Sequence, residues 1–310
     1  MIGYRTGVAL TLLSSSFFGL MGLFNKLARE GGLGLYERIT LRFLVAALTL
    51  WVVLKLRGKS TALPRHLRGR LFIASSLFFG GTSYLLFLSY AYIPTSLTTT
   101  LHFIYPLLVL ILAIGFDGYR PSTMQKWGTL FSLAGLYLAV RPTGGSSANQ
   151  GWGIALALVS ALTFCLYVRF LNQKEIKALD NTTLMLHILC SAAFAWAIPT
   201  VVVLLKGGHA PIIWAKAVAG IAGLSLLSTV LGCTFFSLGI RAIGSERASI
   251  LSVFEPVTAI LAGVILLGES LPPTFALGSM LIIGGSYLVS RNRKQNAVVP
   301  IRLDQKETQA

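Results

Sequence analysis

Long apolar stretches alternate with short polar connections along nearly the whole chain. Ten such stretches stand out, and each is continuously apolar rather than alternating between apolar and polar residues. About 20 apolar residues in a helix span a hydrocarbon layer of ~30 Å, whereas a membrane barrel requires alternation. The pattern therefore predicts ten transmembrane helices. They cover residues 7–28, 39–56, 71–92, 95–116, 124–140, 151–171, 181–205, 217–240, 248–267 and 274–290.

The composition supports an all-α integral membrane protein. Hydrophobic residues make up 55% of the 310 residues and charged residues only 12%. Soluble domains contain about 25% charged residues, so this chain cannot cover itself with a water-facing surface. We therefore expect the lipid bilayer to be the main partner of its surface.

The basic residues indicate how the helices are oriented. Six Lys and Arg residues lie between positions 55 and 70, in the connection after the second predicted helix. Such clusters stay on the cytoplasmic side, which places both termini of a ten-helix chain in the cytoplasm. Of the 26 Lys and Arg residues, this orientation puts 18 inside and seven outside, with Arg169 within a helix. We expect a multi-pass protein of a cell inner membrane. Nucleic-acid binding is not expected, because no soluble basic domain is present.

An internal repeat divides the chain. A shift of 150 residues brings 84–141 into register with 234–291, and a shift of 146 aligns the first helix with the sixth. We predict a first five-helix repeat over 3–142, an external linker over 143–150, a second repeat over 151–291 and a cytoplasmic tail over 292–310. Matched residues include Pro106 with Pro256, Gly118 with Gly268, Gly128 with Gly278, Gly135 with Gly285 and Tyr137 with Tyr287.

The odd number of helices in each repeat determines their relative orientation. A second block of five helices must enter the membrane from the side opposite to the first. The two repeats are therefore predicted to be inverted about a pseudo-two-fold axis in the membrane plane. Inverted repeats are typical of secondary transporters, whose central site opens alternately to the two sides.

The chain resembles the EamA-type drug/metabolite transporter (DMT) superfamily over about residues 5–291. The resembling features are Arg42-Phe43, Pro106, Glu255-Pro256, Gly268-Glu269 and the glycines of the fifth and tenth helices. Gly118-Tyr119 departs from the Gly-Glu pair common in the family, although Asp117 is adjacent. The resemblance implies ten helices in two repeats and transport of small metabolites, often outward, including amino acids.

Three ionisable side chains within the predicted helices are candidates for binding substrate or protons, since such groups are costly in a membrane. Arg42 either extends to the interface or attracts a substrate carboxylate. His102 is either a hydrogen-bonded core residue or a substrate contact. Glu255 precedes Pro256, which is expected to leave the carbonyl of Ser252 free. Its carboxyl either binds a cation, amine or proton, or stays protonated for a structural reason.

Further candidates are less specific. Arg169 either extends to the interface or pairs with Glu255, and Tyr105 occupies the position equivalent to Glu255. Pro106 and Pro256 are expected to break their helices, and Gly268 and Glu269 to serve packing or gating. The remaining cavity candidates are Tyr84, Tyr167 and Ser14.

No motif indicates an enzyme or a cofactor. The sequence has no nucleotide-binding P-loop, HExxH or GxSxG motif and no cluster with metal-ligand spacing. Its three cysteines are expected to be small buried residues. We predict a secondary transporter that exports a small polar metabolite by alternating access, with protons as a candidate coupling ion. The alternatives are a passive channel or facilitator and an intramembrane enzyme.

Overall fold

The computed structural model describes residues 3–117, 121–139, 148–171, 173–206, 211–243, 248, 251–252, 254–270 and 272–291. Within these residues all regular secondary structure is helical. Seven helical spans of 22 to 27 residues are long and apolar enough to cross a membrane. Three shorter helices, α8, α15 and α16, complete ten spans. The predicted ten-helix, all-α membrane fold is therefore confirmed.

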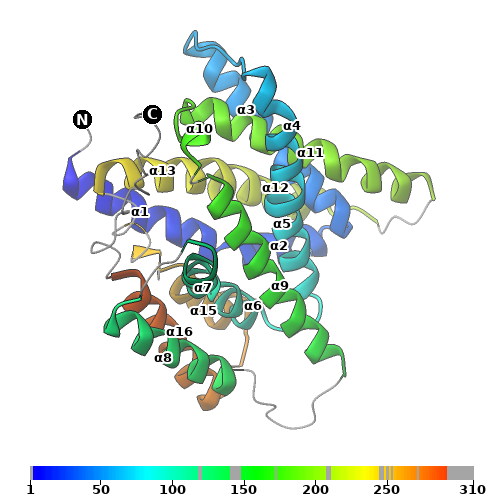
Figure 1. Ribbon diagram of the computed structural model, residues 1–310. Coiled ribbons are helices and arrows are strands. Elements are labelled where there is room, and N and C mark those ends of the chain that lie inside the picture. The colour runs from blue at the N-terminus through cyan, green and yellow to red at the C-terminus, as the bar shows by residue number, and fades with distance from the viewer. Residues whose placement is uncertain are drawn as a thin grey trace, which may run out of the picture.

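The spans follow one another in the predicted order (Figure 1). A short helix, α10 (Lys174–Lys177), lies between the sixth and seventh spans. In chain order the spans are α1–α2 (Tyr4–Gly19, Met21–Glu30), α3 (Leu35–Leu56), α4–η1–α5 (Arg65–Ala74, Ser75–Gly80, Gly81–Ser89), α6–α7 (Thr95–His102, Tyr105–Asp117), α8 (Thr123–Ala139), α9 (Ala148–Leu171), α11 (Asn181–Leu205), α12–η2–α13 (Trp214–Ala222, Gly223–Leu231, Gly232–Ile243), α15 (Phe254–Leu267) and α16 (Pro273–Arg291).

Irregularities recur at equivalent positions of the two halves. The third and eighth spans each contain a π-helical segment, η1 and η2, and adding 150 to η1 gives residues inside η2. The fourth span is interrupted between His102 and Tyr105, and the ninth has a turn at Ser252 before α15 begins. π-Helical turns are rare and are frequently found at functional sites. The repeat therefore preserves the breaks as well as the helices.

Contacts between the halves follow the same symmetry. Gly7 of α1 packs against Ile243 at the end of α13, and Gly153 of α9 packs against Ile93 after α5. A shift of 146 turns Gly7 into Gly153, and a shift of 150 turns Ile93 into Ile243. The two contacts are thus the same contact made twice, as expected for two repeats related by a pseudo-two-fold axis.

Helices α8 and α16 lie side by side and run in opposite directions (Figure 1). Gly135 approaches Gly278, whereas Gly285 approaches the backbone of Gly128, so residue numbers rise along one helix as they fall along the other. Small residues allow membrane helices to pack backbone against backbone. These four glycines are the ones that the repeat aligns, and they explain why glycine occupies these positions.

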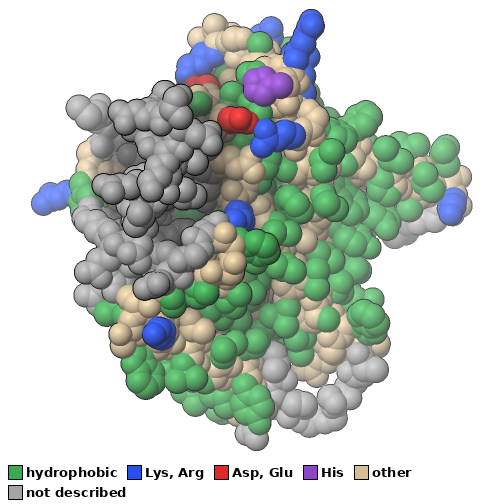
Figure 2. Space-filling view, in the orientation of Figure 1, with side chains coloured by type: hydrophobic (Ala, Val, Ile, Leu, Met, Phe, Trp, Pro, Cys, Tyr) green, Lys and Arg blue, Asp and Glu red, His purple; other side chains and the backbone are tan. Residues whose placement is uncertain are grey.

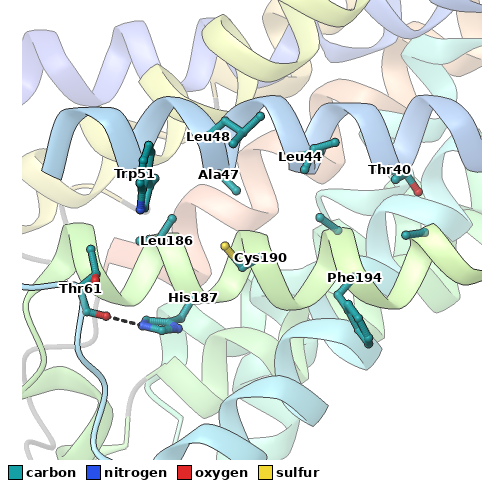
Figure 3. Close-up of a pocket in the computed structure, with 12 residues that line it drawn as sticks. Thr40, Leu44, Ala47, Leu48, Trp51, Thr61, Leu186, His187, Cys190 and Phe194 are labelled. Atoms are coloured by element: carbon teal, nitrogen blue, oxygen red, sulfur yellow. Dashed lines mark hydrogen bonds between the residues drawn. The ribbon is translucent and has the colours of Figure 1, made fainter. Parts of the chain in front are cut away.

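The structure corrects the predictions for the ninth helix and for Cys190. Other predictions concern residues outside the described ranges. The ninth helix, predicted over 248–267, has a turn at Ser252, and α15 begins at Phe254 because the fold is interrupted before Pro256. Cys190 is predicted to be buried but is exposed, because it lines the open pocket between α3 and α11 (Figure 3). Gly118, most of the linker 143–150 and the tail 292–310 lie outside the described residues. The predicted repeat boundaries stay predictions.

Candidate functional site

Arg42 is a cation in the interior of the helix bundle. Its side chain is only 2% exposed. The Nε donates a hydrogen bond to Oγ1 of Thr229 at 2.8 Å, and Nη1 lies 3.4 Å from Oγ of Ser83 and 3.3 Å from Sδ of Met21. The guanidinium also lies 5.5 Å from the ring centroid of Phe87. Its neighbours are therefore neutral hydroxyl, thioether and aromatic groups.

The guanidinium contacts residues of both halves of the protein, Ser83 of the first and Thr229 of the second. Ser83 of α5 becomes Cys233 of α13 after a shift of 150, and Cys233 lies within electrostatic range of Arg42. Arg42 is therefore within range of equivalent positions of the two repeats. No carboxylate among the described residues forms an ion pair with it. A buried charge without a counter-ion is costly, and an incoming anion would offset that cost.

Tyr90 interacts electrostatically with two ionisable groups of the interior, Arg42 and Glu255. Its hydroxyl is buried, lies 3.5 Å from Oγ1 of Thr99, and is within electrostatic range of both Arg42 and Glu255. No pattern in the sequence singles out this residue. A tyrosine at the end of an apolar stretch has no distinguishing spacing, so only the three-dimensional arrangement identifies it.

Glu255 lies in the first turn of α15 and is partly exposed. Its backbone N–H donates to the carbonyl of Ser252 at 2.9 Å. The prediction that this carbonyl is free is therefore wrong. Glu255 makes no ion pair with any described residue, and the predicted pairing with Arg169 is not present. Gly19 of α1 allows the backbone of Glu255 to approach closely. The fold thus holds an uncompensated carboxyl group near Tyr90.

An aromatic wall lies beside Glu255. Tyr105, its equivalent in the first repeat, is within electrostatic range of it. The Tyr105 ring packs edge-on against Phe164 at 4.8 Å, and the Tyr167 ring lies 5.9 Å from Phe164. His102 Nδ1 is hydrogen-bonded to Oγ of Ser160 at 2.9 Å. The structure thus packs the fourth span against both the sixth and the ninth, with Tyr105 within electrostatic range of the carboxyl group.

Three other candidates lie apart from this group. Ser14 is fully buried and donates to the backbone carbonyl of Gly232 at 2.7 Å, which is a helix-packing contact. Tyr84 stacks on Trp196, with ring centroids 4.8 Å apart. Arg169 lies 5.6 Å from the ring centroid of Phe116, near the end of α9.

Glu269 forms a cap between the halves. Its carboxylate accepts four hydrogen bonds from the backbone and hydroxyl groups of Thr95 and Ser96, at 2.6 to 3.1 Å. These are the first residues of α6, where the helix dipole favours a negative charge. Gly268 has a φ of +67°, a conformation that glycine adopts readily, and so permits the turn that aims Glu269 at α6. Pro106 and Pro256 lie in the first turns of α7 and α15.

Comparison with known proteins places this geometry in a group of transporters. The model of the EamA-like transporter family matches residues 5–141 and 151–291. An uncharacterized transporter of Archaeoglobus fulgidus is 28% identical over 261 residues, covering 82% of this chain and 88% of that protein. A WAT1-related protein of Arabidopsis thaliana is 26% identical over 323 residues, covering 92% and 88%.

Two further comparisons are consistent with this result. An uncharacterized transporter of Synechocystis is 29% identical over 191 residues, and the match spans 58% of this chain and about half, 54%, of that relative. A solved crystal structure superimposes with a TM-score of 0.65 at 14% identity, covering 93% of this chain and 98% of that chain. At this identity the structural match supports the fold alone.

Proposed function

We propose that this chain, which belongs to the EamA-like transporter family, exports small zwitterionic metabolites such as amino acids. The family makes it a multi-pass membrane transporter, and the names of its relatives point to transport rather than to an enzyme. The substrate class, the outward direction, the inner-membrane location and the cytoplasmic termini are our proposals. The cytoplasmic assignment is supported by the basic loop between α3 and α4.

One observation carries the substrate proposal: Arg42 and Glu255 are both within electrostatic range of Tyr90, and neither forms an ion pair with a described residue. An amino acid carries a carboxylate and an ammonium group. In the proposed complex Arg42 binds the carboxylate through charge-assisted hydrogen bonds and Glu255 binds the ammonium group. The aromatic wall of Tyr105 and Phe164 accommodates an apolar side chain.

The inverted repeats supply the alternating-access mechanism. Because the contacts Gly7–Ile243 and Gly153–Ile93 are equivalent, the two halves can exchange conformations about the same central site. In the proposed cycle, helices of both repeats rock around Arg42 and Glu255, so that the site faces one compartment at a time. A passive channel would have both sides open at once.

Coupling to protons is a separate step of the proposal. Glu255 is the group proposed to exchange a proton as the site reorients, because it is a partly exposed interior carboxyl that forms no ion pair with a described residue. A facilitator that equilibrates its substrate needs no such proton. In proteoliposomes, the coupled mechanism predicts that Glu255→Gln abolishes uptake driven by a pH gradient. Exchange should be weakened but still measurable, because the amide oxygen still accepts a hydrogen bond from the ammonium group.

Counterflow in proteoliposomes tests the transport proposal. Vesicles preloaded with one unlabelled amino acid at a time are diluted into the labelled amino acid, and uptake is followed against external concentration. Saturable, transient accumulation is expected for a zwitterionic substrate but not for its amide, which lacks the carboxylate. Flux that increases linearly with concentration would indicate a channel, and equal transport of the amide would contradict the role of Arg42.

A further inference from the structure

A groove runs between α3 and α11 on the outer side of the helix bundle (Figure 3). Its volume is about 660 Å³. Exposed apolar side chains such as Leu48 and Trp51 of α3 and Phe194 of α11 belong to its lining. In a multi-pass membrane protein, apolar side chains exposed at this depth face lipid rather than water. The groove is therefore suited to an apolar molecule.

The groove has two different ends. At one end α3 and α11 are joined by a hydrogen bond of 2.9 Å between the hydroxyl groups of Thr40 and Thr200. At the other end lie Trp51 and His187, whose Nε2 is 2.9 Å from the carbonyl oxygen of Thr61. From Thr40 to Trp51 the helix rises about 16 Å at 1.5 Å per residue. This is close to one leaflet of a hydrocarbon core of ~30 Å, the depth reached by one acyl chain.

Basic side chains gather at the second end. The ammonium group of Lys55 lies 5.9 Å from the ring centroid of Trp51, which lines the groove. Arg68 lines an adjoining pocket of about 490 Å³, and His187 belongs to the lining of both pockets. The Nε of Arg68 donates to the carbonyl of Leu63 at 3.1 Å. One cation thus lies beside the apolar groove, and a second lines the pocket that shares His187 with it.

The charge of this region is not balanced within the described residues. Of the six basic residues between 55 and 70, Lys59 pairs with Asp180 at 3.3 Å and Arg70 pairs with Glu175 at 2.8 Å. The other four form no ion pair with a described residue: Lys55, Arg57, Arg65 and Arg68. Figure 2 shows Lys and Arg side chains at this end of the molecule, next to a broad hydrophobic face.

We propose that an anionic phospholipid binds here, with one acyl chain in the groove between α3 and α11 and its phosphate between Lys55 and Arg68. A headgroup with a net negative charge complements the unbalanced cations. A zwitterionic headgroup brings its own ammonium group and complements them less well. The bound lipid would also stabilise the contact between α3 and α11, which come from different repeats. This inference is independent of the identity of the transported substrate.

Native mass spectrometry of the full chain in detergent tests the proposal. Phosphatidylglycerol and phosphatidylcholine with identical acyl chains are added in equal amounts, and the bound fractions are compared. We expect a preference of about tenfold for phosphatidylglycerol. The double substitution Lys55→Gln and Arg68→Gln should remove this preference. The matched substitution Arg57→Gln and Arg65→Gln removes the same charge from the same loop and should retain it.

A second variant tests the acyl-chain site without altering any charge. Leu48→Trp fills the groove and should lower binding of both lipids several-fold, while millimolar glycerol phosphate should not displace the lipid. Equal binding of the two lipids by the unmodified chain would overturn the proposal, as would equal loss in both double variants. Displacement by glycerol phosphate would assign the site to free anions. A lipid-free dimer would assign the groove to a second copy.

Discussion

Glu269 closes the N-terminus of α6 by accepting hydrogen bonds from the backbone N–H of Thr95 at 2.7 Å and from its hydroxyl at 2.6 Å. The two residues are 174 positions apart and belong to different repeats. The contact therefore fixes the start of the fourth span against the end of the ninth. A side chain at the end of one repeat determines where a helix of the other repeat begins.

We expect Glu269→Gln to destabilise the protein by about 1–3 kcal/mol, because the amide cannot accept all four hydrogen bonds and lacks the charge that favours the helix terminus. Thermal unfolding of the purified protein in detergent measures the effect. Glu175→Gln is the matched control, since the ion pair of Glu175 with Arg70 is exposed and contributes about 0–1 kcal/mol. Equal shifts for the two variants would mean that the cap contributes little.

The contact between α8 and α16 predicts opposite outcomes for neighbouring glycines. A methyl group at Gly285 would collide with the backbone of Gly128 and Ser132, whereas one at Gly284 meets no atom within 4 Å. Gly285→Ala should therefore lower stability by about 1–3 kcal/mol through overpacking. Gly284→Ala should be neutral or slightly stabilising, because alanine favours the helix. Unfolding temperatures of the two variants, measured in the same detergent, test this difference in stability.

The stability of the fold depends on pH through the carboxyl group of Asp180. Its carboxylate accepts a hydrogen bond from the backbone N–H of Thr183 at the start of α11 and pairs with Lys59, and both contacts lower its pKa below the ordinary value of 3.8. A lowered folded-state pKa means that the stabilisation is complete above the ordinary value and is lost as pH falls through the folded-state value.

Asp180→Asn should therefore reduce the loss of stability between about pH 4 and pH 2, while the amide oxygen retains part of the cap. Unfolding temperatures measured across this interval for the two proteins give the comparison. Because Asp180 is largely exposed, the effect should be small. A variant whose acid dependence equals that of the unmodified protein would show that other carboxyl groups are responsible.

The helices and their repeat could be predicted from the sequence because the bilayer imposes them. Continuous apolar runs need no partner to be recognised, and Gly128 and Gly278 are recognisable because backbone contact admits few other residues. The interruptions within the helices were harder to predict from the sequence. The turn at Ser252 and the two π-helical segments depend on packing between helices, and local sequence does not specify that packing.

The candidate site could be predicted only in part, for a related reason. Arg42 and Glu255 stand out because a charge within an apolar stretch is rare. Tyr90 is equally central, yet tyrosines are common in membrane helices and its neighbours are distant in the sequence. Ser14 is the opposite case. Its position in the sequence suggested that it lines a cavity, but its hydroxyl donates a hydrogen bond to the carbonyl of Gly232.

Arg42 should tolerate no conservative replacement if it binds a carboxylate. Arg42→Lys keeps the positive charge but loses the planar fork that holds Thr229 and a substrate carboxylate together. We expect counterflow of the substrate to fall about 10-fold or more, which corresponds to about 1.4 kcal/mol. Lys216→Arg is the matched control, because its exposed ion pair with Glu30 accepts either cation. Similar activity of the lysine variant and the unmodified protein would contradict the proposed contact.

Tyr90 provides the most specific test of the site, because a single hydroxyl can be removed while the ring stays in place. The ring centroid lies 6.0 Å from that of Phe87, and the residue is within electrostatic range of both Arg42 and Glu255. Tyr90→Phe should therefore fold normally and lower kcat/KM for transport about 5–10-fold, the loss of one hydrogen bond of about 1 kcal/mol. Tyr92→Phe, at an exposed tyrosine two residues away, should leave transport unchanged. If both variants transport like the unmodified protein, the Tyr90 hydroxyl has no role in the site and only its ring is needed for packing.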